Sequence, residues 1–356
     1  MASIENKKAL HVLCLLTLKP DNMAEAIRYV AGLDPEARKE FRALADSHHV
    51  LIRALVRVTC NTCDPELSRW ATVAISDEHE RIHNALQRLH AICNELEAAG
   101  CPVTVMKSLD HWPDLGNDLD LFTTADEQRV TAVMTEKFGA QIESRSWGDR
   151  LANKWNFRVP GLPEAVEVHA RRLGQTGEHT ALARRFISRR VPREVGSFSF
   201  LVPAPEERII EAALQRMYRH FYFRVCDIVD TAALVDSQAL GFAELQAACE
   251  QAGIWPGVAS FLRIVSDWTE RYRGEPLPLP ARVVADAHFG GDIVYPGGRF
   301  LRIPILPHGL RLYTAQMLRT ASRGDLAATL RLGLLPPLAS AAAVAFRLTG
   351  SDKGVW

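Results

Sequence analysis

The sequence predicts an α+β fold, in which a small mixed β-sheet forms a nucleus between helical N- and C-terminal lobes. Short runs of alternating apolar residues are concentrated between residues 102 and 170, which favours strands there. On both sides of this stretch the apolar residues recur every three or four positions, which is typical of helices. We therefore expect a helical lobe at residues 1–75, an α/β core at 76–200 and a second helical lobe at 201–356.

Composition restricts the classes of partner. The chain has 356 residues, 42 Lys and Arg against 42 Asp and Glu, so no global field attracts nucleic acid and any polyanion site must be local. Seven scattered cysteines indicate reduced thiols and a cytoplasmic location rather than a disulfide framework. The longest apolar runs, at 9–18 and 333–346, are shorter than the roughly 20 residues of a membrane span, so no membrane partner is expected.

The N-terminal lobe carries one motif of interest, Cys60 and Cys63 separated by two residues. Such a pair can form half of a zinc site or a redox pair. Because no second cysteine pair stands at metal-ligand spacing, two free thiols near a helix end are the favoured interpretation.

A helix is predicted from Ser76, as its N-cap, to the glycine at position 100. It contains His79, Glu80 and His83 in the H-E-x-x-H pattern of zinc metallopeptidases, in which both histidines bind zinc and the glutamate activates water. Leu89 stands where the third histidine of one such class would fall. The peptidase is therefore kept only as an alternative.

Residues 102–124 predict two strands around a loop with proline and glycine turn formers. Asp118 and Asp120 lie on the second strand, so both carboxylates project to one side, roughly 6 to 7 Å apart, while Leu119 and Leu121 enter the core. Thr124 and Glu127 form a predicted capping box that opens the next helix.

A second predicted hairpin joins residues 154–159 to 164–170 through a Pro-Gly turn. Alternation places Glu167 and His169 on the face opposite two core valines. If this strand neighbours the first, Glu167 becomes a third carboxylate beside Asp118 and Asp120. Three anions so close repel one another, so we expect the site only with divalent metal.

These residues resemble a known family. The segments RLHAICNELEAAGCPVTVMKS, GNDLDLFT and VEVH resemble bacterial nucleotidyltransferases of the DNA polymerase β superfamily, over about residues 76–235. The resemblance implies metal-dependent transfer of a nucleoside monophosphate, with Asp118, Asp120 and Glu167 as metal ligands. Lys107 and Ser108 stand where the family has Lys-Gly or Gly-Ser, and Glu167 stands where aspartate is commoner.

Arginines cluster after the third carboxylate. Guanidinium groups suit triphosphate, pyrophosphate or an RNA backbone, but a solvated helix face is an equally good interpretation. The cluster consists of Arg171, Arg172, Arg184, Arg185, Arg189, Arg190 and Arg193.

A long helix is predicted from Pro205 to Asp236, with His220, Arg224 and Asp227 on one polar stripe. The resemblance implies that this stripe contacts nucleotide phosphate or base. The competing interpretation is a buried ion pair between Arg224 and Asp227 that fixes the helix.

The sequence thus favours a nucleotidyltransferase that binds an NTP such as ATP, with Mg²⁺, or Mn²⁺ in its place, held by Asp118, Asp120 and Glu167. Lys107 and Ser108 are candidates for the β- and γ-phosphates, and Arg224 for the leaving group. The acceptor is open between a small molecule, a protein and a tRNA. The alternatives are a non-catalytic nucleotide-binding protein of the same fold, the zinc metallopeptidase, and a helical scaffold with an incidental acidic strand.

Overall fold

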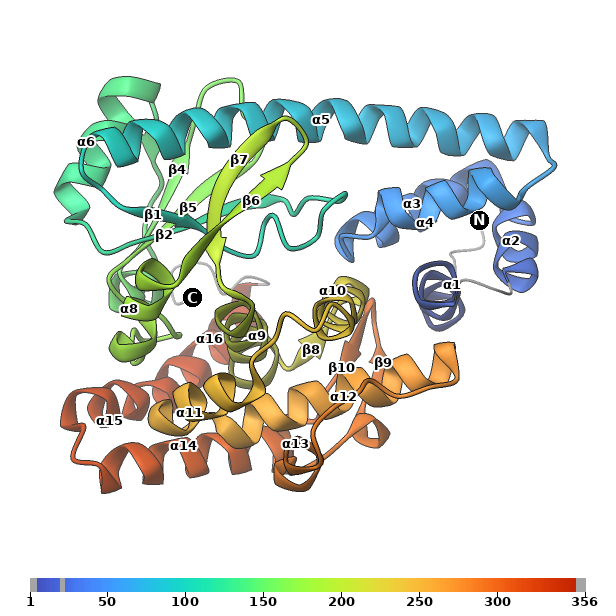
Figure 1. Ribbon diagram of the computed structural model, residues 1–356. Helices are drawn as coiled ribbons and strands as arrows, with labels where there is room; N and C mark the ends of the chain where they lie inside the picture. The colour runs from blue at the N-terminus through green and yellow to red at the C-terminus, as the bar shows by residue number, and fades with distance from the viewer. Residues whose placement is uncertain (1–4, 20–22, 350–356) are drawn as a thin grey trace.

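Five helices form the N-terminal part of the molecule. The computed structural model describes residues 5–19 and 23–349. The last of the five helices, α5, has 34 residues and runs along the top of the molecule in Figure 1, over both the other N-terminal helices and the sheet. The bounds are α1 Asn6–Leu18, α2 Ala24–Ala31, α3 Pro35–Ser47, α4 Leu51–Asn61 and α5 Pro65–Ala98.

The predicted helix start at Ser76 is wrong, because α5 begins eleven residues earlier. The Asp64 carboxylate caps the helix by accepting hydrogen bonds from two backbone amides, at 2.9 and 3.3 Å. Pro65 occupies the first turn, where its missing N–H costs nothing. Leu67 and Ala71 extend the buried stripe, so the helix runs without a break through the predicted boundary between residues 75 and 76.

A five-stranded sheet follows α5, and its strand order is β1-β2-β5-β4-β3. Strands β2 and β5 are parallel at its centre, and the remaining pairs are antiparallel. The predicted α+β class with a small mixed sheet is therefore confirmed. The bounds are β1 Val103–Val105, β2 Asp118–Thr123, β3 Gln141–Ile142, β4 Lys154–Arg158 and β5 Ala165–Ala170.

Helices and a hairpin cover and extend this sheet. α5 packs on β1, and α8 packs on β1 and β2. The cap of α6 differs from the prediction: Asp126, not the Thr124–Glu127 box, accepts a hydrogen bond from the Gln128 amide at 2.9 Å. These elements are α6 Glu127–Phe138, α7 Trp147–Ala152, α8 Thr180–Ser188, β6 Arg190–Val195 and β7 Phe198–Pro203.

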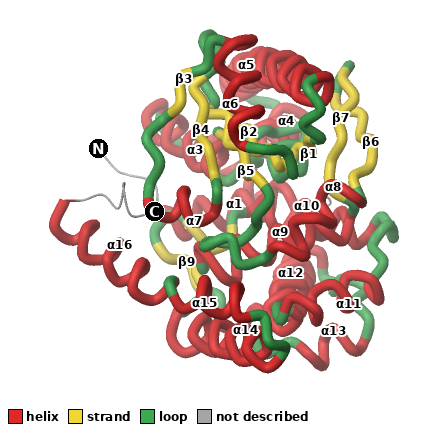
Figure 2. The backbone as a smooth tube through the Cα atoms, turned by 90° about the vertical axis from the view of Figure 1, so that its left-hand side faces the viewer, coloured by secondary structure: helices red, strands yellow, loops and turns green. Residues whose placement is uncertain are grey.

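The C-terminal half is mostly helical and lies below the sheet in Figure 1. Helix α12 packs against α9, α10, α11 and α13, and also against α1, so the two helical ends of the chain contact each other. Figure 2 shows α16 leaving the body at one side. The helices are α9 Pro205–Gln215, α10 Val225–Asp236, α11 Phe242–Ala252, α12 Trp255–Arg273, α13 Ala281–Asp286, α14 Leu310–Ser322, α15 Leu326–Gly333 and α16 Leu335–Thr349.

The long helix predicted from Pro205 to Asp236 is wrong, because the chain breaks between α9 and α10. A π-helical turn, η1 (Arg216–His220), ends the first helix, and Phe221 has a positive φ of 53°. Strand β8 (Tyr222–Phe223) then pairs with β10 (Phe300–Arg302), which also pairs with β9 (Tyr295–Gly297). The backbone groups of β8 find partners on a distant segment, so helical hydrogen bonds are not needed there.

The described helices do not have the character of membrane spans. None of those in residues 5–19 and 23–349 combines the length and the apolar character that a bilayer span requires.

Candidate active site

The acidic edge of the site is built by two neighbouring parallel strands. In the register of β2 with β5, Asp120 lies directly opposite Glu167. Leu119 and Val168 are fully buried on the core face of these strands. Strand alternation therefore turns both carboxylates to the other face, as the sequence predicted.

Basic side chains from this chain contact both carboxylates. Lys107 Nζ lies 2.8 Å from Asp120 Oδ1, and Lys154 Nζ lies 2.9 Å from Glu167 Oε2. His169 Nε2 donates to Glu167 Oε1 at 2.7 Å. The expectation that only a divalent metal could balance these anions is wrong, because two lysines already do so in part.

The two carboxyl groups differ in acidity. Burial raises the pKa of Asp120, and the neighbouring Lys107 only partly opposes this effect. Burial would also raise the pKa of Glu167, but the hydrogen bond from His169 and the nearby lysines hold it well below its usual range. The carboxyl of Glu167 is therefore ionised at neutral pH.

Asp118 stands apart from this pair. The potential ligand atoms of Asp120, Glu167 and His169 lie within 4.8 Å of one another, and Asp118 does not belong to that group. Asp118 is exposed, at the rim of the same cavity, and burial followed by the charge of Glu167 raises the pKa of its carboxyl. The predicted three carboxylates thus consist of an inner pair and one outer member.

The Lys107–Ser108 turn connects β1 to the loop before β2. Lys107 adopts a positive φ of 44°, a backbone conformation in which glycine is favoured. The lysine therefore keeps the turn geometry that a glycine would allow. Ser108 Oγ accepts a hydrogen bond from the Asp120 amide at 2.8 Å and donates to the Asp118 carbonyl at 3.1 Å. Its hydroxyl proton is thereby used to hold β2, which leaves it no donor for a phosphate.

A cavity of about 410 Å³ opens beside these carboxylates. The acidic edge forms one wall, and η1 with the start of α10 forms the wall that faces it. All eight predicted site residues line this cavity: Lys107, Ser108, Asp118, Asp120, Glu167, His220, Arg224 and Asp227.

The facing wall is basic. Arg216, Arg219 and Arg224 line it, and sequence reasoning missed the first two. Arg216 pairs with Asp227 at 2.7 Å, so the predicted ion pair between Arg224 and Asp227 is wrong. Within the described residues, Arg219 and Arg224 have no carboxylate at ion-pair distance, so their charges remain available to an anionic ligand.

Two histidines frame this wall in their neutral form. His49 Nε2 accepts a hydrogen bond from Arg224 Nη1 at 2.7 Å, which holds that guanidinium at the cavity. Burial and the neighbouring charges lower the pKa of His49. Burial, together with the charges of Arg219 and other arginines, lowers the pKa of His220 to about 2. His220 therefore adds no positive charge.

An ion-pair network anchors this wall to the N-terminal helices. Arg53 of α4 donates to Asp114 at 2.8 Å and to Asp230 of α10 at 2.5 Å. His111 Nδ1 donates to the other Asp230 oxygen at 2.6 Å. The network joins α4, the β1–β2 loop and α10, the three segments that surround the basic wall.

Glu211, on α9, is a further cavity residue that the sequence did not single out. Its side chain is buried, and neither carboxylate oxygen has a hydrogen-bond partner among the described residues. Lys107 Nζ lies 3.8 Å away, which is too long for a hydrogen bond. Burial raises the pKa of Glu211 to about 8, and Lys107 only partly opposes this effect.

The donor set of the acidic edge fits a divalent cation. Asp120 and Glu167 offer hard carboxylate oxygens, and a ring nitrogen of His169 lies at the same point, where it hydrogen-bonds Glu167. Mg²⁺ and Mn²⁺ both prefer oxygen ligands and take up a few carboxylates together with substrate phosphates. Lys107 and Lys154 must move aside or share these oxygens when a cation binds.

Residues 35–270 match the model of a family described as uncharacterised nucleotidyltransferase. The chain belongs to this nucleotidyltransferase family. A solved structure, that of an antigenic nucleotidyltransferase-like protein from Paracoccidioides brasiliensis, is similar at 15% sequence identity over 48% of this chain and 87% of that chain, with a TM-score of 0.32. No curated protein matches the chain.

The alternative interpretation, a zinc metallopeptidase, finds no support in the geometry. His79, Glu80 and His83 lie on exposed positions of α5. Two groups of at least three metal-ligand side chains come together in residues 5–19 and 23–349, and neither contains these residues. The second group, His111 with Cys226 and Asp230, belongs to the network that includes Arg53.

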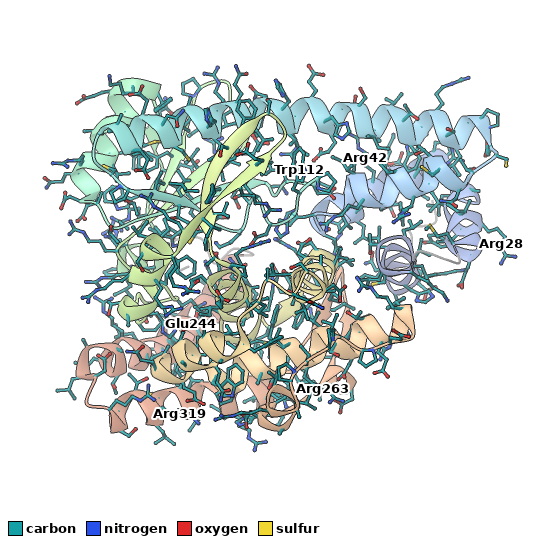
Figure 3. The ribbon with its side chains drawn as sticks, viewed as in Figure 1. Arg28, Arg42, Trp112, Glu244, Arg263 and Arg319 are labelled. Atoms are coloured by element: carbon teal, nitrogen blue, oxygen red, sulfur yellow. The ribbon has the colours of Figure 1, made fainter. Side chains whose placement is uncertain are left out.

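The predicted arginine cluster is mostly consumed by ion pairs, and none of its members lines the cavity. Arg185 of α8 bonds Glu207 of α9 at 2.6 Å and Glu244 of α11 at 2.8 Å. Glu244 lies where α11 meets α8 in Figure 3. Arg189 bonds Glu207 as well, at 3.1 Å. The acids that balance this cluster lie outside its own span, some earlier in the chain and some later, so the cluster has no visible counter-charges when its span is considered alone. They are Glu97, Asp110, Asp126, Glu206, Glu207 and Glu244.

Proposed function

We propose that the nucleotidyltransferase transfers a nucleoside monophosphate from an NTP to a hydroxyl group and releases pyrophosphate. The observation that carries this proposal is the pairing of two opposite walls across one cavity. Asp120 and Glu167 form one wall, and Arg216, Arg219 and Arg224 line the other. A triphosphate with its divalent cation needs carboxylates on one side and cationic donors on the other.

The inner carboxylates are suited to hold the cation. Asp120 and Glu167 would be its ligands, with Asp118 at the rim as an outer ligand. Once bound, Mg²⁺ or Mn²⁺ supplies positive charge that lowers the pKa of the acceptor hydroxyl and neutralises the phosphates.

The basic wall is suited to the leaving group. Arg219 and Arg224 would donate hydrogen bonds to the β- and γ-phosphates, because their guanidinium groups carry no competing carboxylate. Lys107 would turn from Asp120 to a phosphate oxygen when the cation binds. Ser108, in the turn after β1, would keep its hydrogen bonds to the β2 backbone at the Asp118 carbonyl and the Asp120 amide, and so hold these two residues in place.

The reaction needs no covalent work from the protein. The acceptor oxygen forms a bond to the α-phosphorus, and the bond from the α-phosphorus to the bridging oxygen of the β-phosphate breaks. Pyrophosphate leaves while the arginines of the basic wall stabilise its negative charge. Catalysis then comes from positioning and charge stabilisation. A small molecule, a protein side chain and a tRNA end all offer the required hydroxyl.

Label transfer tests the proposal. The protein is incubated with α-labelled ATP, CTP, GTP or UTP and Mg²⁺ or Mn²⁺, and pyrophosphate and labelled products are measured. Transfer that Asp120→Asn abolishes, while the exposed control Asp77→Asn retains it, supports the proposal. Transfer by both variants alike overturns the assigned site, and nucleotide binding without pyrophosphate release supports the non-catalytic alternative.

A further inference from the structure

Helix α9 carries three buried glutamates that differ in their partners. Glu207 is fully buried and bonds Arg185 and Arg189, and Glu206 bonds Arg189 at 2.7 Å. Glu211, one turn after Glu207, is also buried but has no hydrogen bond to either oxygen among the described residues. A buried carboxyl without partners costs stability, so its position calls for a ligand that supplies the missing bonds.

Glu211 lies between two spaces. It lines the main cavity and also a side pocket of about 60 Å³. Lys107, Gln215 and Arg219 line both spaces as well. The side pocket is lined by the apolar or aromatic side chains of Met106, Leu173, Phe186, Leu214 and Tyr218, and also by His169, Gln175 and Glu178. A group in the side pocket therefore lies beside both Glu211 and His169, the histidine of the acidic edge.

We propose that Glu211 is the catalytic residue that receives the proton of the attacking hydroxyl, and that the acceptor approaches it through the side pocket. The inference rests on the proposed function. The acceptor O–H breaks as the oxygen bonds the α-phosphorus, the proton passes to a Glu211 oxygen, and pyrophosphate departs with the electrons of the broken P–O bond. The acceptor is then a molecule that presents its hydroxyl on a small apolar group.

Other groups in the cavity are less suited to this task. Asp120 and Glu167 are already bonded by Lys107, Lys154 and His169. A general base must lie within hydrogen-bond reach of the proton and must have a free oxygen to accept it. Glu211 has two. Because burial raises its pKa to about 8, its carboxylate, the form that accepts a proton, becomes populated as the pH rises through that value, and turnover should rise with it.

The competing role for Glu211 is structural, as a counter-charge for Lys107 at 3.8 Å. The two roles predict different effects of substitution. A counter-charge is needed to hold Lys107 and hence for NTP binding. A proton acceptor is needed for turnover but not for NTP binding.

The test uses the full chain, the NTP that the wild type prefers, Mg²⁺ and 1-propanol, which carries its hydroxyl on a small apolar chain, as the supplied hydroxyl donor. Glu211→Ala should lower kcat by about 10²- to 10⁴-fold with little change in KM for the NTP. Formate should restore part of the turnover of Glu211→Ala, because it enters the vacated space, and none of that of Glu211→Gln, whose amide fills it. Glu211→Asp should keep part of the rate.

Stability and a matched variant separate misfolding from lost chemistry. Glu211→Gln should melt close to the wild-type temperature, because it replaces a buried carboxyl that has no hydrogen-bond partner among the described residues with an amide of similar size. Folded Glu207→Gln should turn over normally. Turnover of Glu211→Ala within threefold of wild type, or a loss that formate does not rescue and that comes with a raised KM, overturns the inference. Wild-type protein that transfers no label overturns the proposed function itself.

Discussion

The residues of the two cavity walls are positioned by different kinds of structure. On the acidic wall, Asp120 and Glu167 are placed by the alternation of two paired strands, so each carboxylate position follows from its immediate neighbours. On the basic wall, Arg216, Arg219 and Arg224 are placed by a π-helical turn and by the pairing of β8 with a distant strand. Residues in register along a strand are therefore predictable, whereas residues around a chain break are not.

The walls also differ in how their charges are balanced. The acidic wall is partly neutralised by Lys107 and Lys154, which come from the same sheet region. On the basic wall, Arg216 is neutralised by Asp227, but Arg219 and Arg224 have no carboxylate partner in the described part of the chain. The comparison predicts that acidic-wall changes act on cation binding and chemistry, and basic-wall changes act on nucleotide affinity.

The largest expected effect is on the acidic wall. Asp120→Asn should lower the rate of nucleotidyl transfer by about 10³-fold or more, because it removes a cation ligand worth several kcal/mol of charge stabilisation. Label transfer at saturating NTP measures this. A rate within tenfold of wild type, from a variant whose circular dichroism is unchanged, would show that the acidic wall is not the reacting side.

The next effect concerns stability away from the cavity. Glu207→Gln should lower the free energy of unfolding by about 1.5 to 3 kcal/mol, because it weakens the charge-assisted hydrogen bonds to Arg185 and Arg189, which keep Glu244 and Glu206 as their remaining partners. Urea unfolding measures the change. A loss under 1 kcal/mol would mean that solvent screens these pairs, and that α9 is held in place by its apolar face instead.

On the basic wall, Arg224→Ala should raise KM for the NTP by about 10- to 100-fold, the cost of a lost charge-assisted hydrogen bond. His49→Ala should raise it less, and the double variant should be no worse than Arg224→Ala, because His49 acts by holding that guanidinium.

The control for this pair is Arg263→Ala, whose side chain lies on α12, outside the cavity (Figure 3). It should leave KM unchanged. Additive effects of the His49 and Arg224 substitutions would contradict the contact between them, and a fall in kcat with an unchanged KM would move Arg224 from the nucleotide to the chemistry.

The smallest expected effect is thermal. Mg²⁺ at about ten times its Kd should stabilise the protein by roughly 1.4 kcal/mol, a rise of a few degrees in Tm. Displacement of Lys107 and Lys154 from the carboxylates raises the Kd, and therefore the Mg²⁺ concentration at which this gain is reached. Calorimetry with and without EDTA measures it. An equal rise in Asp120→Asn would place the cation elsewhere.

The interrupted helix shows where sequence reasoning stopped. Residues 216–224 fit a helical period, so His220, Arg224 and Asp227 were expected on one stripe. The run Phe221, Tyr222 and Phe223 did carry a signal, since consecutive aromatic residues favour strands. Its pairing partner near Leu301 was too far along the chain to be inferred.

Glu211 carried a weaker signal still. Its neighbours Ile210 and Ala213 are buried. Glutamate, however, is a residue type normally found on the exposed face of a helix, so the sequence alone gave no reason to place Glu211 in the interior. Only the tertiary structure shows that Glu207 finds two arginines while Glu211, one turn later, faces open space beside Lys107.

By itself, the sequence determined the mixed sheet, the core leucines and valines of β2 and β5, and the common direction of Asp118 and Asp120, because a strand's period of two is set by the local backbone. Only the tertiary structure decided which lysines neutralise Asp120 and Glu167, which arginines face them, and where the chain leaves the helix at Arg216. Those outcomes depend on contacts between segments that are far apart in the chain. Such contacts produce no periodic pattern of apolar and polar residues from which they could be predicted.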